Sequence, residues 1–300
     1  MKQILIKLSI ITLLITACSK PKSVINVDKN ITFSYPKTEI PKEDTKLWIA
    51  DGDSTKQTVA IFLQGGPKDV LNFEKKKKSV WRYLPDYEDY YRIHLHQAQT
   101  LNPGIFTSES EFTMDMARVE VDNTSEILYR AIKHFKAKGK KVLVISHSYG
   151  AFIIPHYLAT RPSLADKYVI ISGRIDDPKE SVEAHSKGFN GTFKNGKTFI
   201  TDEGIKDFSE YNKWAKLYYR GKQLIKGAIG EVPYSTALKS VDLSNVIYIY
   251  SAIDERVGGL TKSEIDFLNS KNVQVFESER EHGHTWKDLI DLIKNGKIKL

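Results

Sequence analysis

The chain has 300 residues, of which 41% are hydrophobic and 27% are charged, and its formal net charge is +8. This balance is typical of a globular protein with a sizeable core, and it argues against a mostly disordered chain or a multi-span membrane protein. The single cysteine excludes an intrachain disulfide framework and a cysteine-rich zinc site.

The N-terminal segment has the pattern of an export signal. Lys2 and Lys7 precede an uncharged run over residues 8–17 that is rich in leucine and isoleucine. A membrane-spanning helix needs ~20 apolar residues, so this run is too short to span a bilayer, but its length suits the hydrophobic region of a signal peptide.

The uncharged run ends in Ile15-Thr16-Ala17-Cys18, which resembles the lipobox of bacterial lipoproteins. The resemblance implies a signal peptide over residues 1–17 and a lipid on Cys18 that holds the protein to a membrane of the bacterial cell envelope, outside the cytoplasm. Residues 18–30 are polar and indicate a tether. Ser19 stands where an aspartate would favour the inner membrane, so a Gram-negative source implies the outer membrane. The alternative is an ordinary secretory signal with a chance cysteine.

Short apolar runs indicate β-strands, and segments with helical spacing lie between them. The predicted strands are residues 31–35, 47–50, 59–63, 91–95, 142–145, 168–171, 246–250 and 273–276. The predicted helices are residues 128–135, 149–160, 263–270 and 285–293. Apolar strands that alternate with helices favour the α/β class, with a mostly parallel sheet covered by helices on both faces.

Residues 176–243 interrupt this alternation and are longer than a crossover between parallel strands requires. We interpret them as an inserted cap on a core formed by residues 31–175 and 244–300. The cap contains Asn195-Gly196, which favours a type I′ hairpin turn, and an amphipathic helix around residues 208–218 with an aromatic face. That face either packs on the core or lines a substrate pocket.

The apolar strand over residues 142–145 leads directly into Ser146-His147-Ser148-Tyr149-Gly150 and a helix. This sequence resembles the nucleophile elbow of the α/β-hydrolase superfamily, a strand-to-helix turn with the pattern G-x-S-x-G. Ser148 takes the nucleophile position. Ser146 replaces the first glycine of the pattern, although it is also a small residue.

A serine hydroxyl needs a base to remove its proton, and the superfamily places an acid and then a histidine downstream. Asp254 follows the strand over residues 246–250, a position that favours it over Glu255 and Asp266. One helix and one strand later, the chain returns to the same edge at Glu281-His282-Gly283-His284. We expect His284 to be the base in preference to His282, because the catalytic histidine often follows glycine in this superfamily.

The strand over residues 59–63 ends in Gln64-Gly65-Gly66-Pro67, which is similar to the oxyanion loop of proline iminopeptidases and related esterases. The resemblance implies that a backbone N–H from Gly65 or Gly66 acts together with the N–H of Tyr149 as an oxyanion hole. Gln64 replaces the histidine of that loop, and this departure argues against peptidase activity more than against the hole itself.

At the level of the superfamily, the resemblance covers about residues 31–300. It implies an α/β-hydrolase fold with an eight-stranded, mostly parallel sheet and an inserted cap. It also implies a Ser148–His284–Asp254 triad that cleaves an ester, thioester or amide of a small-molecule or peptide substrate through an acyl-enzyme, without metal or cofactor.

Two alternatives stay open beside this interpretation. A catalytically silent scaffold that serves as a surface binding protein fits the departures at Ser146 and Gln64. A zinc site could use His94 and His96, which lie on one face of a predicted strand, but no carboxylate follows them in the spacing of metallohydrolases. Nucleic acid is not an expected partner, because the excess charge is modest and no binding motif accompanies it.

Overall fold

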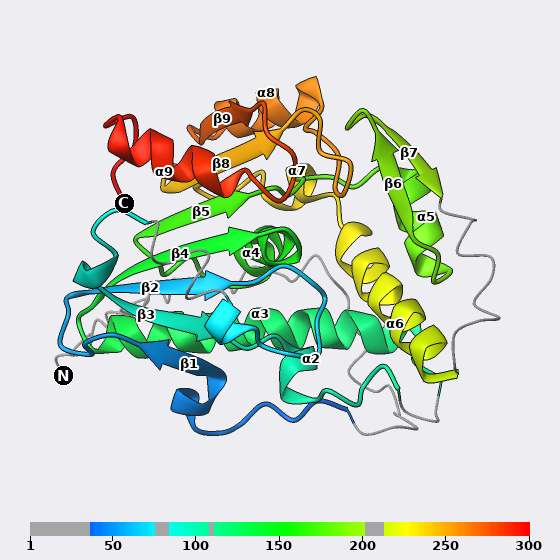
Figure 1. Ribbon diagram of the computed structural model, residues 1–300, viewed down its shortest axis with the longest axis horizontal. Helices are drawn as coiled ribbons and strands as arrows, with labels where there is room; N and C mark the ends of the chain where they lie inside the picture. Colours follow the sequence, from blue (N-terminus) through cyan, green and yellow to red (C-terminus); the bar gives the residue numbers. More distant parts are fainter. Residues whose placement is uncertain (1–36, 76–83, 108–110, 202–212) are drawn as a thin grey trace, which may run out of the picture.

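The computed structural model describes residues 37–75, 84–107, 111–201 and 213–300 (Figure 1). The signal peptide, Cys18, the tether and the predicted strand over residues 31–35 lie outside the described residues. No helix within the described part of the chain is long and apolar enough to span a membrane.

The centre of the fold is a seven-stranded sheet, with the strand order β1-β3-β2-β4-β5-β8-β9. β1 pairs antiparallel with β3, and all other neighbours pair in parallel. The strands are β1 (Trp48–Asp51), β2 (Thr58–Leu63), β3 (Tyr90–Leu95), β4 (Lys141–His147), β5 (Lys167–Ile171), β8 (Val246–Ser251) and β9 (Gln274–Ser278). Each coincides within a few residues with a predicted apolar run, so the mostly parallel sheet is confirmed. The expected eighth strand is the one over residues 31–35.

The helices outside residues 176–243 include α2 (Ala98–Leu101), α3 (Met114–Ala137), α4 (Tyr149–Thr160), α8 (Lys262–Ser270) and α9 (Trp286–Lys294). Four of these five lie where the periodicity predicts them, although α3 begins well before the predicted residues 128–135, and the short α2 has no predicted counterpart. Short 3-10 helices, η1 (Asp44–Leu47) and η3 (Tyr87–Asp89), precede β1 and β3.

Alternate side chains of each strand point to opposite faces of the sheet, so the core has two parts. On one face, Ile61 and Val144 pack in a cluster with residues of α3, α4 and α6. On the other face, Phe62 and Ile145 pack with Leu289 of α9. The sheet is therefore covered on both faces, as predicted for strands without a polar side.

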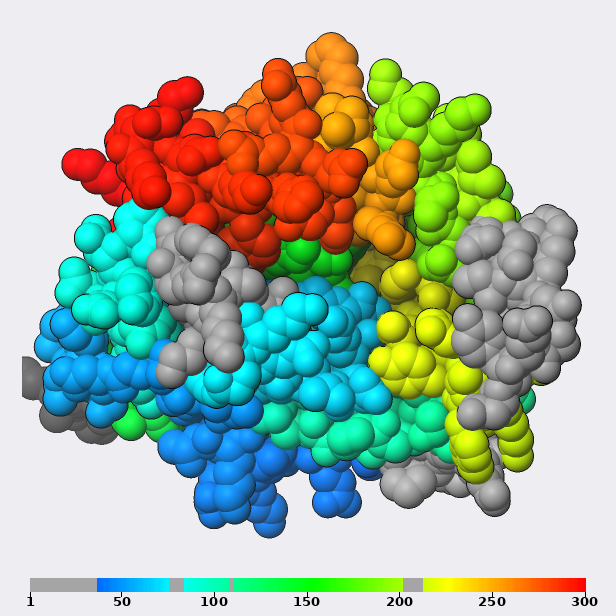
Figure 2. All heavy atoms as spheres, in the orientation of Figure 1, coloured from blue at the N-terminus to red at the C-terminus, as the bar shows by residue number. Residues whose placement is uncertain are grey.

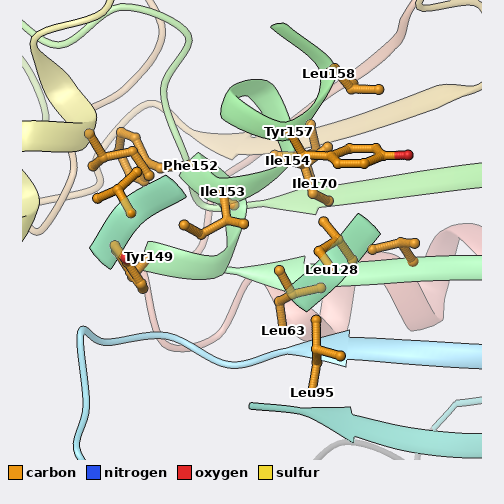
Figure 3. Close-up of a cluster of buried hydrophobic side chains, with 14 of the residues drawn as sticks. Leu63, Leu95, Leu128, Tyr149, Phe152, Ile153, Ile154, Tyr157, Leu158 and Ile170 are labelled. Atoms are coloured by element: carbon orange, nitrogen blue, oxygen red, sulfur yellow. The ribbon is translucent and has the colours of Figure 1, made fainter. Parts of the chain in front are cut away.

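α4 is the most buried of these helices, because its apolar residues surround its whole axis. Every residue from Tyr149 to Ala159 is buried. Figure 3 shows Ile153, Ile154 and Tyr157 of α4 beside Leu63 of β2 and Ile170 of β5. This packing holds the N-terminus of α4 at the carboxyl end of β4.

Residues 176–243, the cap segment, hold α5 (Lys179–Ser186), a hairpin of β6 (Gly191–Lys194) and β7 (Thr198–Thr201), α6 (Lys213–Gly230) and α7 (Tyr234–Ala237). Asn195 and Gly196 both have positive φ angles, 52° and 69°, so the predicted type I′ turn is confirmed. α6 lies across the end of the molecule toward which the sheet strands point (Figure 1). That the cap segment is an insertion separate from the core stays a prediction.

In the described part of the predicted aromatic face of the cap helix, Tyr218 packs on the core. The Tyr218 ring lies edge-on to Phe106, and its hydroxyl donates to Asp69 at 3.0 Å. Trp214 is 44% exposed. Phe208 and Tyr211 lie outside the described residues.

A buried ion pair joins α8 to the chain that leaves β5. The Glu264 carboxylate accepts from the Arg174 guanidinium at 2.9 Å and from the N–H groups of Ile175, Asp176 and Thr261. Glu264 is 3% exposed, so removing its carboxylate leaves the Arg174 charge and the three N–H groups without this partner.

We therefore expect Glu264→Ala to lower the free energy of unfolding by about 3 kcal/mol, which corresponds to a fall in Tm on the order of 10 °C. Asp266→Ala is the matched control on the same helix. Its pair with Lys262 is exposed and worth at most about 0.5 kcal/mol. Equal losses in the two variants, measured by thermal unfolding, would contradict the structural role given to Glu264.

Candidate active site

Ser148 occupies a strained turn between β4 and α4. Its φ and ψ angles are 57° and −124°, a region that a residue with a side chain adopts only when its surroundings enforce it. Ser148 is partly exposed, whereas His147 and Tyr149 on either side are buried. The turn thus presents the Ser148 hydroxyl at the carboxyl end of the sheet.

The packing around this turn explains why small residues stand at positions 146 and 150, two before and two after Ser148. A Cβ atom at Gly150 would lie 2.6 Å from the Leu63 carbonyl oxygen, so a larger residue would collide with β2. Ser146 is fully buried, and its hydroxyl donates to the Val169 carbonyl of β5 at 3.1 Å. The departure at Ser146 is therefore accommodated by a hydrogen bond to the neighbouring strand.

Asp254 follows β8 and is completely buried. Its Oδ1 accepts from the N–H groups of Arg256 at 2.8 Å and Val257 at 3.0 Å. Its Oδ2 lies 2.7 Å from Nδ1 of His282. These three contacts fix the direction of the carboxylate.

His282 is therefore the histidine that the structure brings to Asp254, and the expected pairing of Asp254 with His284 is wrong. His284 is exposed and does not line the pocket that contains Ser148 and His282. The two side chains diverge because the loop makes a tight turn there, with the His284 N–H donating to the Glu281 carbonyl at 2.8 Å.

The other two candidate acids, Glu255 and Asp266, lie on the surface. Glu255 is exposed. Asp266 pairs with Lys262 on the surface of α8. Of the three candidates that follow β8, Asp254 is the one whose carboxylate contacts a histidine, as its place at the strand end predicts.

The position of His282 is held through its backbone carbonyl, a feature that the sequence does not reveal. This oxygen accepts from His147 Nε2 at 3.0 Å, from Thr285 Oγ1 at 3.1 Å and from Ser172 Oγ at 3.4 Å. The rings of His147 and His282 lie 4.9 Å apart. The last residue of β4 and residues that follow β5 and β9 thus fix the loop that carries the histidine.

The Gly65-Gly66 loop lies against the Ser148 turn. A Cβ atom at Gly65 would lie 3.0 Å from the Ser148 Cβ, so glycine allows the loop backbone to approach the serine. The N–H of Tyr149 belongs to the first residue of α4, which has no carbonyl acceptor within its own helix. Gly66 and Tyr149 both line the cavity that contains Ser148.

Gln64, which replaces the histidine of the similar oxyanion loop, has a structural role. It is 1% exposed, its Nε2 donates to the Val70 carbonyl at 2.8 Å, and its Oε1 accepts from the Asn72 N–H at 3.2 Å. Gln97 supports the same loop from beyond β3, since its Nε2 donates to the Gln64 carbonyl at 2.8 Å and its Oε1 accepts from the Lys68 N–H at 3.2 Å. The two glutamines therefore shape the glycine loop.

Ser148 and His282 face one cavity of about 540 Å³, a volume that suits a small-molecule ligand. In Figure 2, a hollow opens between the blue-to-cyan and the orange-to-red segments, with green atoms at its bottom and yellow α6 at its side. Its apolar lining comes from residues of α4, the hairpin, α6 and the loop after β8, namely Phe152, Phe193, Ile229 and Val257.

Charged side chains also line this cavity. Lys68, Lys226 and Arg256 supply positive charge, and Asp177 supplies a carboxylate. Burial, together with the neighbouring Lys222 and Arg256, lowers the pKa of Lys226 to about 8. Burial raises the pKa of Asp177 to about 7 against the opposing charge of Arg174.

The hairpin of the cap segment contacts the loop that carries Asp254. The Phe193 N–H donates to the Glu255 carbonyl at 2.9 Å, and the Gly259 N–H donates to the Gly196 carbonyl at 2.8 Å. A Cβ atom at Gly196 would lie 2.2 Å from the Ala252 carbonyl oxygen. The turn of the hairpin is thus packed directly against the acid loop.

The two histidines of the zinc alternative have other surroundings. His94 is fully buried, with its ring edge-on to those of Phe62 and Phe73. His96 Nδ1 lies 2.8 Å from the Thr100 hydroxyl. Within the described ranges, no group of three histidine, cysteine, aspartate or glutamate side chains is arranged to hold a metal ion.

The overall structure is similar to solved α/β-hydrolases. MGS-M2, an alpha/beta hydrolase enzyme from a Medee basin deep-sea metagenome library, aligns with 84% of this chain and 94% of its own, at a TM-score of 0.51 and 15% identity. MenH from S. aureus aligns with 83% of this chain and 96% of its own, at a TM-score of 0.51 and 13% identity. A hydrolase from Oleispira antarctica aligns with 86% of this chain and 98% of its own, at a TM-score of 0.51 and 11% identity.

These similarities show that the chain has the α/β-hydrolase fold, as the resemblance of its motifs predicts. No protein-family model matches the sequence. No curated protein sequence matches it either.

The contact between hairpin and acid loop gives a test that needs no substrate. We expect Gly196→Ala to push the hairpin away from Ala252, because the added Cβ meets backbone and the φ angle of 69° disfavours a side chain. The amides of Arg256 and Val257, which bind Asp254, should then exchange hydrogen about tenfold faster or more.

Gly139→Ala is the control for this experiment. Its φ angle is also positive, 71°, but its added Cβ meets no atom within 4 Å. It should cost about 1 kcal/mol of stability without faster exchange in the acid loop. Unchanged exchange at Arg256 and Val257 in Gly196→Ala, measured by hydrogen–deuterium exchange, would show that the hairpin does not support this loop.

Proposed function

We propose that this protein is a serine hydrolase that cleaves an ester, thioester or amide with a triad of Ser148, His282 and Asp254. The observation that carries the proposal is the 2.7 Å contact between Asp254 and His282 Nδ1, made beside a cavity that Ser148 enters from a strained strand-to-helix turn. A fold shared with hydrolases supports it.

The arrangement suggests how the first half of the reaction proceeds. Asp254 accepts from Nδ1–H of His282, which leaves Nε2 as the nitrogen that can take a proton. As the Ser148 oxygen attacks the substrate carbonyl carbon, its proton passes to Nε2. The carbonyl oxygen becomes an oxyanion, which the N–H of Tyr149 and an N–H of Gly65 or Gly66 stabilise.

The intermediate then collapses. The bond to the leaving group breaks, Nε2 gives its proton to that group, and an acyl-enzyme ester remains on Ser148. In the second half, water attacks the ester carbonyl and gives a proton to Nε2. Ser148 is released with that proton, and the acid product departs.

The catalytic roles are tested by alanine variants assayed with p-nitrophenyl acetate and a fluorophosphonate probe, which reacts with an activated serine. We expect Ser148→Ala and His282→Ala each to lose about 10⁴-fold or more in kcat, and the double variant to resemble either single one, because the three residues act as a unit. Asp254→Asn should lose about 10⁴-fold through the wrong imidazole tautomer.

His284→Ala is the matched control, because it removes an imidazole from the same loop. It should retain most activity and probe labelling. An inactive His284→Ala with an active His282→Ala would reverse the assignment of the base. A folded wild-type protein that neither reacts with the probe nor hydrolyses esters would support the silent binding scaffold instead.

We further propose that the mature protein is held to a membrane of the cell envelope by a lipid on Cys18. The support is the hydrophobic region that ends in Ile15-Thr16-Ala17-Cys18. Residues 19–36 would then separate the lipid from the described part of the chain. In a Gram-negative cell, Ser19 after the cysteine favours the outer membrane.

Cys18→Ala should abolish incorporation of labelled palmitate and move the protein out of the membrane fraction. The folded domain should keep its Tm, because Cys18 precedes the described residues. Ser19→Ala, one residue further on, should still be lipidated. A wild-type mature N-terminus downstream of Cys18, established by mass spectrometry, would rule the anchor out.

A further inference from the structure

Three basic side chains from separate parts of the chain line the cavity that contains Ser148 and His282. Lys68 follows β2, Lys226 lies in α6 of the cap segment, and Arg256 follows β8. Among the described residues, none of the three forms an ion pair with a carboxylate. Asp177, the acidic residue of the lining, is likewise without an ion pair in that part of the chain.

Lys226 is the most enclosed of the three cations. It is partly buried, and its Nζ has one described hydrogen bond, a long one of 3.4 Å to the neutral Asn190 amide oxygen. Lys222 lies one helical turn before it, so α6 places two like charges on one face, an arrangement that destabilises a helix. A lysine with a purely structural role would be expected to pair or to extend its ammonium into water.

The pKa values of Lys226 and Asp177 reflect the free-energy cost of placing charges in this cavity. Burial and the nearby cations lower the pKa of Lys226 to about 8, so it still carries a charge at neutral pH. The partly protonated Asp177, with its pKa raised to about 7, compensates that charge incompletely. An anion placed in the cavity would supply the missing partner.

We propose that the substrate carries an anionic group, a carboxylate or a phosphate, that binds Lys226 together with Arg256 and Lys68 while the scissile carbonyl lies at Ser148. This inference rests on the proposed hydrolase function and adds a substrate class to it. The cavity also predicts an apolar body between the two ends of the substrate, because Phe152, Ile229 and Val257 line it.

Binding to the Ser148→Ala protein tests this inference separately from catalysis, because that variant should hold esters without cleaving them. Three probes share one scaffold: 4-acetoxybenzoate, 4-acetoxyphenyl phosphate and the neutral methyl 4-acetoxybenzoate. A further pair consists of mono-4-nitrophenyl adipate, which carries its anion on the acyl side, and its neutral methyl ester. We expect at least one anionic probe to bind about tenfold more tightly than its neutral partner, by calorimetry.

Adding Lys226→Met should weaken that anionic probe about tenfold or more, since one charge-assisted hydrogen bond is lost while the apolar stem is kept. Adding Lys226→Arg should preserve most of the preference. Lys239→Met, at an exposed lysine that does not line the cavity, is the control and should leave every Kd unchanged. Which probe binds distinguishes carboxylate from phosphate and the leaving-group side from the acyl side.

Two results would overturn the inference: anionic probes that bind no more tightly than their neutral partners, or a preference that survives Lys226→Met combined with Arg256→Gln. Neither result would bear on the triad, which the hydrolysis assays of Ser148→Ala and His282→Ala decide. Conversely, an inactive wild-type protein that still binds the anions through Lys226 would reject the hydrolase function and leave an anion-binding site.

Discussion

Parallel pairing of the sheet strands is the constraint on which the site depends. Strands that run in the same direction end at the same edge, so the residues that follow them meet there although they are far apart in the sequence. Gly65 follows β2, Ser148 follows β4, Asp254 follows β8 and His282 follows β9. Apolar side chains on both faces of the sheet fix the register of these strands, and therefore the relative heights of the four residues.

At this edge of the sheet, hydrogen bonds to backbone groups fix the orientation of the site residues. Ser148 is held in an unfavourable conformation between a buried strand and a buried helix. Asp254 is oriented by two backbone N–H groups, and His282 is oriented both by Asp254 and through its own carbonyl. The Asp254–His282 pair is therefore held in place beside the cavity that Ser148 lines, and such preorganisation is how active sites lower the free energy of a transition state.

The cap segment contributes to this site in two ways. Its hairpin packs on the acid loop through Gly196, and α6 brings Lys226 into the cavity beside Ser148. A change in the cap would therefore alter both the orientation of Asp254 and the charge that a substrate meets.

The sequence alone predicted the strands of the sheet and the sharp turn at Ser148, because the signals are local. An apolar strand that runs into Ser146-His147-Ser148-Tyr149-Gly150 predicts the turn, and Asn195-Gly196 predicts the hairpin, since backbone geometry limits which residues can occupy such positions. The position of Asp254 followed from topology, because a residue just after a parallel strand must lie at its carboxyl edge.

The choice between His282 and His284 depended on the tertiary structure. Both histidines lie in one short loop after β9, and the path of that loop is set by donors from His147, Ser172 and Thr285, two of which come from distant parts of the chain. Lys226 and Arg256 were missed for a similar reason. Each is an ordinary basic residue in its local sequence, and only the packing of α6 over the carboxyl edge of the sheet brings the two charges into one cavity with Ser148.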